Sequence, residues 1–271
     1  MSSLAETERY TVPALQRGLQ LLQAFSHSER SHTSADLARK FGWPRASVFR
    51  MLCTLEQMGF VERSADGVGF HLGLGVLRMG FEYLASMELA ELGRPIIDTL
   101  CEQTGYSAHV VVRDGPEVVF VAKVVGRNAL FHSVQVGARL PAHATVLGRV
   151  LLAGHNLAAL RSLYPQEPLI AYTAQTPTSR AQLHSMVQLI AKQGFGISQG
   201  AYEPGISTIA APVFNAQREL VAAISITVPA QHLEAAQATL LVAQVRAAAQ
   251  QLTQRLGHGG AGAPSPILRA A

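Results

Sequence analysis

Apolar residues in the first part of the chain recur at the spacing of amphipathic helices. Residues 14–25 carry one such stripe, formed by Leu15, Leu19, Leu22 and Phe25. The segment Thr33-Ser34-Ala35-Asp36 then has the form of an N-terminal cap, in which a threonine and a later acid satisfy free backbone amides. The pattern predicts a first helix over 14–25 and a second, shorter one that ends near Phe41, where Gly42 stops it.

A third helix is expected from Pro44 to about Met58, because proline is tolerated in a first helical turn. Its apolar side is formed by Val48, Met51, Leu52 and Leu55. At about 100° per residue, the opposite side carries Ala46, Phe49, Arg50, Cys53 and Gln57. Gly59 ends this helix, and strands over 60–63 and 68–72 with a Ser-Ala-Asp-Gly turn between them predict a hairpin. Three helices followed by a hairpin form a winged helix-turn-helix.

Apolar runs and turn signals continue through the rest of the chain. The expected strands are Val110–Val112, Val118–Val121, Leu130–Val136, Thr208–Phe214 and Leu220–Val228. The expected helices are Val146–Ala153, Arg180–Gln193 and a long Ala/Gln-rich helix over 231–256. The Gly/Pro/Ala-rich end is expected to be disordered. Between the two halves, residues 75–86 spread apolar side chains around a helix, so this segment needs a partner, either its own winged domain or a second copy.

Charge adds information only locally, because the formal net charge is +4, from 22 Lys and Arg against 18 Asp and Glu. Arg39, Lys40, Arg45 and Arg50 fall in one window with no acid between Asp36 and Glu56. A helix fits the DNA major groove, and arginine suits guanine edges or phosphate. We therefore expect DNA contacts from Arg17, Arg45, Ala46, Ser47, Phe49 and Arg50. The alternative is that these residues form the solvated face of an ordinary three-helix unit, and Trp43 is expected in the core.

Other function classes find less support in the sequence. No apolar run has the length of a membrane span or a signal-peptide core. The two cysteines, Cys53 and Cys101, have no metal or redox spacing. The protein is therefore expected in the cytoplasm, without a metal or a cofactor. The best enzyme alternative combines His143 and Thr145 with Ser198 and Glu203, but no GxSxG or HExxH motif accompanies them, and a structural role for His143 is favoured.

Several longer segments resemble the IclR family of transcriptional regulators over nearly the whole chain. They include SADLARKFGWPRASVFRMLCTLEQMGFVER at 34–63, VGARLPAHATVLGRVLLA at 136–153 and GISTIAAPVFNAQRELVAAISITVP at 205–229. The resemblance implies an α+β protein with a winged helix-turn-helix over 1–74, a connecting helix over 75–90, a GAF/profilin-like mixed α/β effector-binding domain over 91–257 and a tail over 258–271. It also implies dimers, or dimers of dimers, that bind operator DNA with paired half-sites.

The same resemblance implies an effector site formed by Val146, Leu147, Ser198, Thr208, Ser225 and Thr227. Ser198 stands where members that bind small 2-oxo acids have an acid, and Thr208 where a cysteine is frequent. Val146-Leu147 is also bulkier than the Gly-Ala that can occur there. An apolar wall with hydroxyl donors favours a carboxylated aromatic effector, with a 2-oxo-acid-sensing regulator of central metabolism as the alternative. For Ser225 and Thr227, simple strand alternation is the competing explanation.

Overall fold

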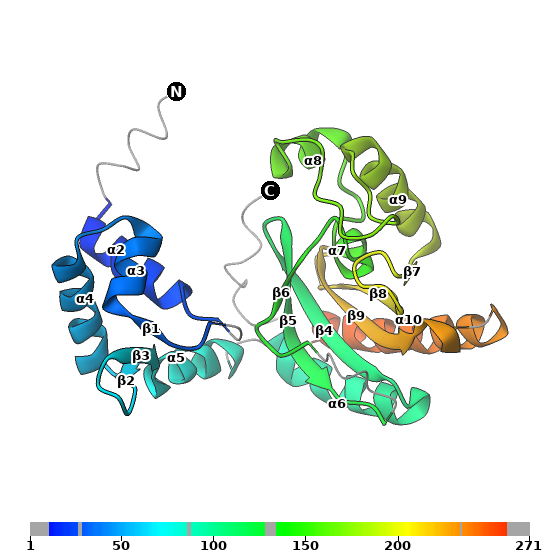
Figure 1. The fold of residues 1–271 in the computed structure, drawn as a ribbon. Helices are drawn as coiled ribbons and strands as arrows, with labels where there is room; N and C mark the ends of the chain where they lie inside the picture. The colour runs from blue at the N-terminus through cyan, green and yellow to red at the C-terminus, as the bar shows by residue number, and fades with distance from the viewer. Residues whose placement is uncertain (1–10, 27–28, 86–87, 128–133, 234, 259–271) are drawn as a thin grey trace. The chain divides into compact units, whose positions relative to one another are not determined.

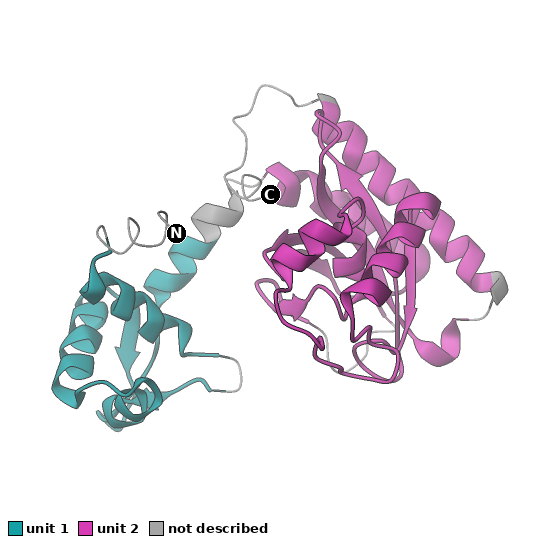
Figure 2. Ribbon diagram, turned by 90° about the horizontal axis from the view of Figure 1, so that it is seen from above, with its two compact units in different colours: residues 1–86 teal, residues 87–271 magenta. Residues whose placement is uncertain are grey.

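The computed structural model describes residues 11–26, 29–85, 88–127, 134–233 and 235–258. The chain divides into two compact units, residues 1–86 and 87–271 (Figure 2). Each unit has its own hydrophobic core, so each is described by itself. The expected tail over 258–271 lies outside the described residues except for its first position.

Unit 1 is a small helical domain with a three-stranded sheet (Figure 1). Its elements are α2 (Pro13–Gln23), β1 (His32–Thr33), α3 (Ser34–Phe41), α4 (Arg45–Gln57), β2 (Val61–Arg63), β3 (Gly69–Leu72) and α5 (Leu74–Ala85). The strands lie in the order β1-β3-β2, and both pairings are antiparallel. The predicted three helices and hairpin are confirmed, whereas the two-residue strand β1 was not predicted.

Local signals set the ends of α3. The hydroxyl of Thr33 accepts a hydrogen bond from the Asp36 amide at 3.1 Å, and the Thr33 amide donates to the Asp36 carboxylate at 3.2 Å. This reciprocal capping satisfies two amides that the helix leaves free. At the other end Gly42 adopts a φ of 68°, a left-handed conformation that glycine enters without a steric cost. Pro44 then caps α4 instead of forming its first turn, so that helix begins at Arg45.

The core of unit 1 is formed by one face of each helix and the sheet. Its buried members are Leu21, Ala24, Phe25, Leu37, Val48, Leu52, Val61 and Phe70. The predicted inner face of α4 is thus confirmed. The predicted stripe on α2 is only half right, because Leu15 is 62% exposed and Leu19 is 52% exposed while Leu21 is fully buried. The apolar spacing of α2 fits two overlapping stripes, and the core takes Leu21, Ala24 and Phe25 instead of Leu15 and Leu19.

Unit 2 is built on a six-stranded antiparallel sheet in the order β6-β5-β4-β9-β8-β7. The strands are β4 (Ser107–Asp114), β5 (Glu117–Val124), β6 (Arg139–Pro141), β7 (Gly196–Gln199), β8 (Ile206–Phe214) and β9 (Leu220–Pro229). The helices are α6 (Glu88–Thr104), α7 (Val146–Leu151), α8 (Leu157–Leu163), α9 (Arg180–Gln193) and α10 (Ala235–His258), with the short 3-10 helix η1 (Ala230–His232) before α10.

Helices cover both faces of this sheet (Figure 1). On one face α6 and α10 pack against the strands and against each other, and a Cβ at Gly93 of α6 would meet Val110 of β4 at 3.0 Å. On the other face α7 packs on the central strands, with α9 and α8 outside it. The residues between α7 and the sheet include Val111, Phe120, Ala210, Ala223 and Val150, all buried. The central strands are covered on both sides, which explains their nearly continuous apolar sequence.

Several predicted elements of unit 2 agree with the structure, including α9 at its predicted bounds. The expected strand Leu130–Val136 does not: residues 134–136 form no strand, residues 128–133 lie outside the described residues, and β6 lies further along at Arg139–Pro141. The expected connecting segment 75–90 covers most of α5, two undescribed residues and the start of α6. The elements α8 and β7 were not predicted.

Candidate functional site

The outer face of α4 carries the side chains that the sequence predicted for DNA contact. Arg45, Ala46, Phe49 and Arg50 are exposed, and Ser47 is half-buried. The intervening Val48 is fully buried and anchors the helix to the core. Neither Arg45 nor Arg50 forms an ion pair among the described residues. Two cations on the free side of a short helix can meet nucleic-acid phosphates or base edges.

Arg17 lies on α2, away from this helix in sequence, and contacts an aromatic side chain. Its guanidinium carbon is 5.4 Å from the ring centroid of Trp43, and Trp43 stacks on Phe41 at 4.6 Å between centroids. Trp43 is partly buried and packs against the unit 1 core, which confirms the core position predicted for it. The contact places Arg17 next to the turn that precedes α4.

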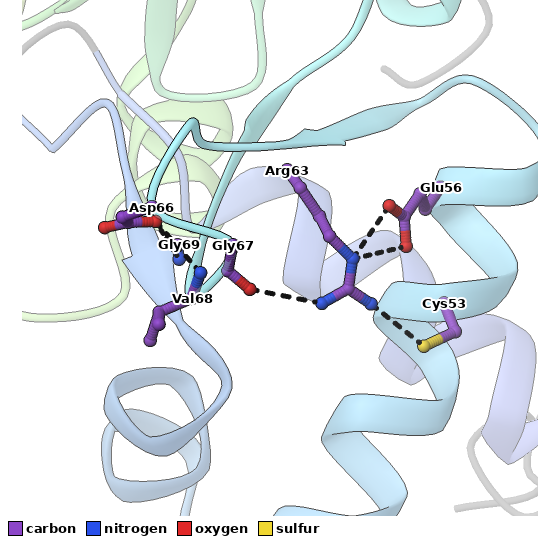
Figure 3. A network of polar contacts seen from close by, with 7 residues as sticks. All are labelled: Cys53, Glu56, Arg63, Asp66, Gly67, Val68 and Gly69. Atoms are coloured by element: carbon purple, nitrogen blue, oxygen red, sulfur yellow. Dashed lines mark hydrogen bonds and ion pairs between the residues drawn. The ribbon is translucent and has the colours of Figure 1, made fainter.

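A network of polar contacts around Arg63 joins α4 to the hairpin (Figure 3). From β2, Arg63 donates hydrogen bonds to the Glu56 carboxylate, to the Gly67 carbonyl at 3.4 Å and to the Cys53 sulfur at 3.7 Å. The hydrogen bonds to Glu56 hold the pKa of Arg63 above its usual value. Its guanidinium also lies over the rings of Phe49, at 5.5 Å, and Phe70, at 4.8 Å.

The turn of the hairpin is fixed by Asp66 (Figure 3). Its carboxylate accepts hydrogen bonds from the amides of Val68, at 2.9 Å, and Gly69, at 3.1 Å. These two amide donors lower the pKa of Asp66. An aspartate that binds amides two and three residues later is typical of tight turns, and this was the signal for the hairpin in the sequence.

A groove on unit 1 runs between the start of α3, the outer face of α4 and the hairpin. It is lined by Thr33, Ser34, Ala35, Arg45, Ala46, Phe49, Arg63, Gly67, Val68 and Phe70. Two of these lining residues are arginines and none is acidic. Arg63 is paired with Glu56, whereas Arg45 has no ion pair among the described residues, so Arg45 is the cation that this groove offers to an anion. The sequence did not predict the contribution of Arg63 to the groove.

Unit 2 encloses a cavity of about 90 Å³ between α7, the sheet and the loop over 200–206. It is lined by Ser107, His109, Phe120, Val134, Leu140, Thr145, Val146, Leu147, Ser198, Ala201, Tyr202, Glu203, Ile206, Thr208 and Thr227. Five of the six predicted effector residues are therefore brought together, although they come from α7 and three different strands. The exception is Ser225.

Ser225 lies on the same sheet face but is not among the lining residues. In the register it lies opposite His109 of β4 and Ala210 of β8, and it is fully buried. Its hydroxyl has no hydrogen-bond partner among the described residues. Thr227, two positions along the strand, does line the cavity. Ser225 and Thr227 thus lie on the same face of β9, as strand alternation requires. Only Thr227 lines the cavity.

Two backbone features place Val146 and Leu147 in the wall of the cavity. The Thr145 hydroxyl caps α7 by accepting a hydrogen bond from the Gly148 amide at 3.2 Å. A Cβ at Gly148 would lie 2.1 Å from the Cα of Ala142. No side chain fits there, so glycine allows the first turn of α7 to pack directly on the preceding backbone.

His109 is a cavity residue that the sequence analysis did not single out. Its side chain is 3% exposed, its ring meets the edge of Phe120 at 5.3 Å, and its Nδ1 has no hydrogen-bond partner among the described residues. Burial, together with the nearby charge of Lys123, lowers the pKa of His109 to about 4. The imidazole is therefore neutral at pH 7. Its only sequence signal was a polar residue at an inward position of an apolar strand.

The loop over 200–205 adds Tyr202 and Glu203 to the lining. The hydroxyls of Thr173 and Thr176 both donate to the Ala201 carbonyl, at 3.1 and 2.6 Å, and this holds the loop over the cavity. Burial raises the pKa of Tyr202. Ser198 stands where relatives that bind small 2-oxo acids have an acid, but Glu203 places one carboxylate in the lining from this loop.

The enzyme alternative is not supported by the geometry of His143. Its Nε2 is 2.9 Å from the Ile170 carbonyl oxygen, its ring packs against Tyr164 at 5.7 Å, and it does not line the cavity that holds Ser198 and Glu203. Burial lowers the pKa of His143. The structural role expected for this histidine is confirmed by these contacts.

The described residues contain neither a cluster suited to a metal ion nor a helix suited to a membrane span. In this part of the chain no three His, Cys, Asp or Glu side chains gather in a way that could hold a metal ion. None of the helices in the described ranges has both the length and the apolar character needed to cross a membrane.

Two protein-family models match the two units in sequence. The model of the IclR helix-turn-helix domain matches residues 14–65, and that of the bacterial transcriptional regulator IclR C-terminal domain matches residues 81–254. The transcriptional repressor IclR of Escherichia coli K12 is 30% identical over 251 residues, which cover 92% of this chain and 91% of the relative. The Pca regulon regulatory protein of Pseudomonas putida is 31% identical over 215 residues, covering 79% of this chain and 73% of the relative.

Solved structures agree with the sequence comparisons. A transcriptional regulator from Rhodococcus sp. RHA1 is similar with a TM-score of 0.80 and 32% identity, covering 92% of this chain and 100% of that structure. An IclR homologue from Microbacterium hydrocarbonoxydans, complexed with 4-hydroxybenzoate, has the same fold with a TM-score of 0.79 at 22% identity, covering 90% and 98%. Together the two family models span most of the chain. The helix-turn-helix model lies in unit 1 and the C-terminal model lies mostly in unit 2. The chain belongs to the IclR family of DNA-binding transcriptional regulators.

Proposed function

We propose that this regulator controls a catabolic operon in the cytoplasm and that a small carboxylated aromatic compound modulates its binding to the operator. On this proposal residues 1–74 read DNA, residues 75–90 connect the units and residues 91–257 bind the effector. The single observation that carries the effector assignment is the partly open cavity under α7, with an apolar wall and several hydroxyls.

The DNA contacts are assigned to Arg17, Arg45, Ala46, Ser47, Phe49 and Arg50. The support is the exposed outer face of α4 and the acid-free groove beside it. A helix of this kind enters the major groove with its first turns near base edges. Arg45, in the first turn, is assigned to phosphate, and Arg50, one turn later, to a base edge.

The effector contacts are assigned to Val146, Leu147, Ser198, Thr208 and Thr227, with Ser225 behind them in the sheet. Phe120 and the two α7 side chains supply flat apolar surface for a ring, and the hydroxyls supply hydrogen bonds for a polar group. The size of the cavity sets a limit. An engineered apolar cavity of about 150 Å³ takes benzene, so a partly open space of about 90 Å³ takes a single ring only if part of the ligand extends into the opening.

A thermal-shift titration of the full chain tests the effector assignment. Binding to the folded state alone stabilises by about 2.7 kcal/mol when the ligand is at 100 times its Kd. We expect 4-hydroxybenzoate and benzoate to raise the melting temperature more as their concentration increases relative to Kd. Glyoxylate and pyruvate should raise it less. Thr227→Val should reduce the shift, whereas Thr99→Val, an exposed threonine on α6, should not. Stabilisation by the two 2-oxo acids alone would replace the aromatic effector with the alternative.

An operator mobility shift links the two sites. A ligand that changes the affinity for DNA must itself bind with a changed affinity in the presence of DNA, by the same factor. A protein that binds 4-hydroxybenzoate equally well with and without operator would have a ligand but no regulatory coupling.

We also propose that the protein acts as a dimer or a dimer of dimers. Unit 1 exposes apolar side chains on two helices, Leu15 and Leu19 on α2 and Leu74, Leu77 and Met79 on α5. Such exposed apolar residues favour contact with another surface, and a second copy would bring two reading helices to paired half-sites. Light scattering on the wild type and Leu77→Glu tests this, with Arg78→Glu on the same helix as the control. A wild type that stays monomeric at micromolar concentration would contradict the proposal.

A further inference from the structure

Among the lining residues of the unit 2 cavity, His109 alone can become a cation. The other polar members are hydroxyl groups of serine, threonine and Tyr202, and the carboxylate of Glu203. The lining contains no lysine and no arginine. An anion that enters a buried site without a positive partner loses its hydration and gains no opposite charge to compensate, which costs several kcal/mol. A carboxylate therefore has one side chain in this cavity that can neutralise it.

The geometry prepares His109 for that contact. It lies in the middle of β4, on the sheet face covered by α7, with Ser225 opposite it on β9 and Lys123 opposite it on β5. Its Nδ1 is buried and has no partner among the described residues. Most buried polar atoms are hydrogen-bonded, so a histidine that lines the cavity and has one ring nitrogen without a partner among the described residues is a candidate contact for a bound group.

Burial and the charge of Lys123 oppose a positive charge on His109 in the empty cavity, whereas the carboxylate of Glu203 favours one. Lys123 faces it from β5, and Glu203 and Tyr202 face the cavity from the loop above. The strand β9 contributes only the hydroxyls of Ser225 and Thr227, and the start of α7 contributes Val146 and Leu147. Burial and Lys123 are the causes that keep the imidazole neutral, with a pKa of about 4.

We propose that His109 anchors the anionic group of the effector through its imidazolium and that each anion binds together with one proton taken from solvent. This rests on the proposed function of the cavity. The neutral imidazole gains the proton, the ligand stays a carboxylate, and the complex has the same net charge as the empty site. An opposite charge within about 4–6 Å favours the charged form of a histidine, so the carboxylate reverses the effect of burial and of Lys123.

Isothermal titration calorimetry of the full chain with 4-hydroxybenzoate tests the proton. At pH 5.5, the observed enthalpy should vary with the ionisation enthalpy of the buffer, with a slope approaching one proton taken up per site, because the bound carboxylate raises the pKa of His109 by about 1–3 units from about 4. Between about pH 5 and pH 6 the affinity should fall close to tenfold, because each site must gain one proton, and it should level off above about pH 7. Titration with 4-hydroxybenzamide, which has the same ring but no charge, should show no proton uptake.

Two variants separate His109 from the rest of the protein. His109→Gln keeps hydrogen-bonding capacity but cannot be protonated, so its affinity for 4-hydroxybenzoate at pH 5.5 should fall about 10- to 100-fold and its proton uptake should vanish. His184→Gln, on α9 outside the cavity, should behave as the wild type. If His109→Gln does not fold, the buffer slope and pH profile of the wild type decide the question alone.

The failures are distinguishable. Wild type that binds 4-hydroxybenzoate with no proton uptake, or a His109→Gln protein with unchanged affinity and uptake, overturns the role of His109 and leaves the aromatic effector in place. Wild type that binds neither 4-hydroxybenzoate nor benzoate, while it still shifts operator DNA, overturns both the effector assignment and the anchor built on it.

Discussion

The Nε of Arg63 on β2 donates hydrogen bonds to both carboxylate oxygens of Glu56 on α4, at 2.9 and 3.2 Å. The pair joins the hairpin to the helix that carries Arg45 and Arg50 (Figure 3). Because the same guanidinium also contacts Phe49 and Phe70, it sets the distance between the reading helix and the wing. Surface ion pairs alone contribute little to stability, so the main consequence is the orientation of α4.

We expect Arg63→Ala and Glu56→Ala each to weaken operator binding, and the double variant to lose less than the sum of the two. This non-additivity is the signature of residues that act through one contact. Mobility-shift titrations of the four proteins measure it. The exposed pair Arg94–Asp98 on α6 provides the matched control, and strict additivity at Arg63 and Glu56 would show that the pair does not orient the helix.

Arg50 and Arg45 should respond differently to substitution. Arg50→Ala should cost about 1–3 kcal/mol of operator affinity, unevenly across operator variants, if the side chain reads a base edge. Arg45→Ala should weaken all sequences alike and reduce the dependence of affinity on salt, as the loss of a phosphate contact does. Titrations at several salt concentrations separate the two effects. An Arg50→Ala protein with unchanged affinity would move the base contacts to another surface.

Unit 2 should lose stability as the pH falls from about 6.5 to 4. In the folded state burial lowers the pKa of His109 to about 4, and it also lowers the pKa values of His143 and His155. The unfolded chain therefore binds protons first, and the stability contributed by the neutral histidines is present above pH 6.5 and lost below it. For His109 alone the loss approaches about 3 kcal/mol at pH 4. Calorimetry of wild type and His109→Gln should show a smaller pH dependence in the variant, with His184→Gln as the control.

Ser225→Ala should leave the free energy of unfolding unchanged or increase it. The Ser225 hydroxyl is fully buried without a partner among the described residues, and an unsatisfied buried polar group costs about 1–3 kcal/mol. Its response to 4-hydroxybenzoate should also stay close to that of the wild type, whereas Thr227→Val should lose part of it, because only Thr227 lines the cavity. Chemical denaturation and the ligand-dependent melting temperature measure the two quantities. A Ser225→Ala protein with a reduced ligand response would restore this residue to the effector site.

The sequence by itself determined the elements whose signals are local. The cap formed by Thr33 and Asp36, the left-handed Gly42 and the inner face of α4 depend on contacts within one or two helical turns. The hairpin follows from the Asp66 turn in the same way. Five residues that the family resemblance assigned to the effector site do line the cavity of unit 2. In each case the residues that decide the structure are close in the chain, or belong to a recognisable segment.

The tertiary structure decided which surfaces meet. The apolar spacing of α2 fits two overlapping stripes, and packing on Leu37 and Leu52 buries Leu21 while Leu15 stays exposed. The register between β4 and β9 places His109 opposite Ser225. His109 lines the cavity, whereas Ser225 lies behind the lining. Strand pairing joins segments far apart in the sequence, and a shift of one residue would turn every side chain to the other face. No local pattern encodes that choice, because the free energy that fixes it comes from burying both faces of the sheet at once.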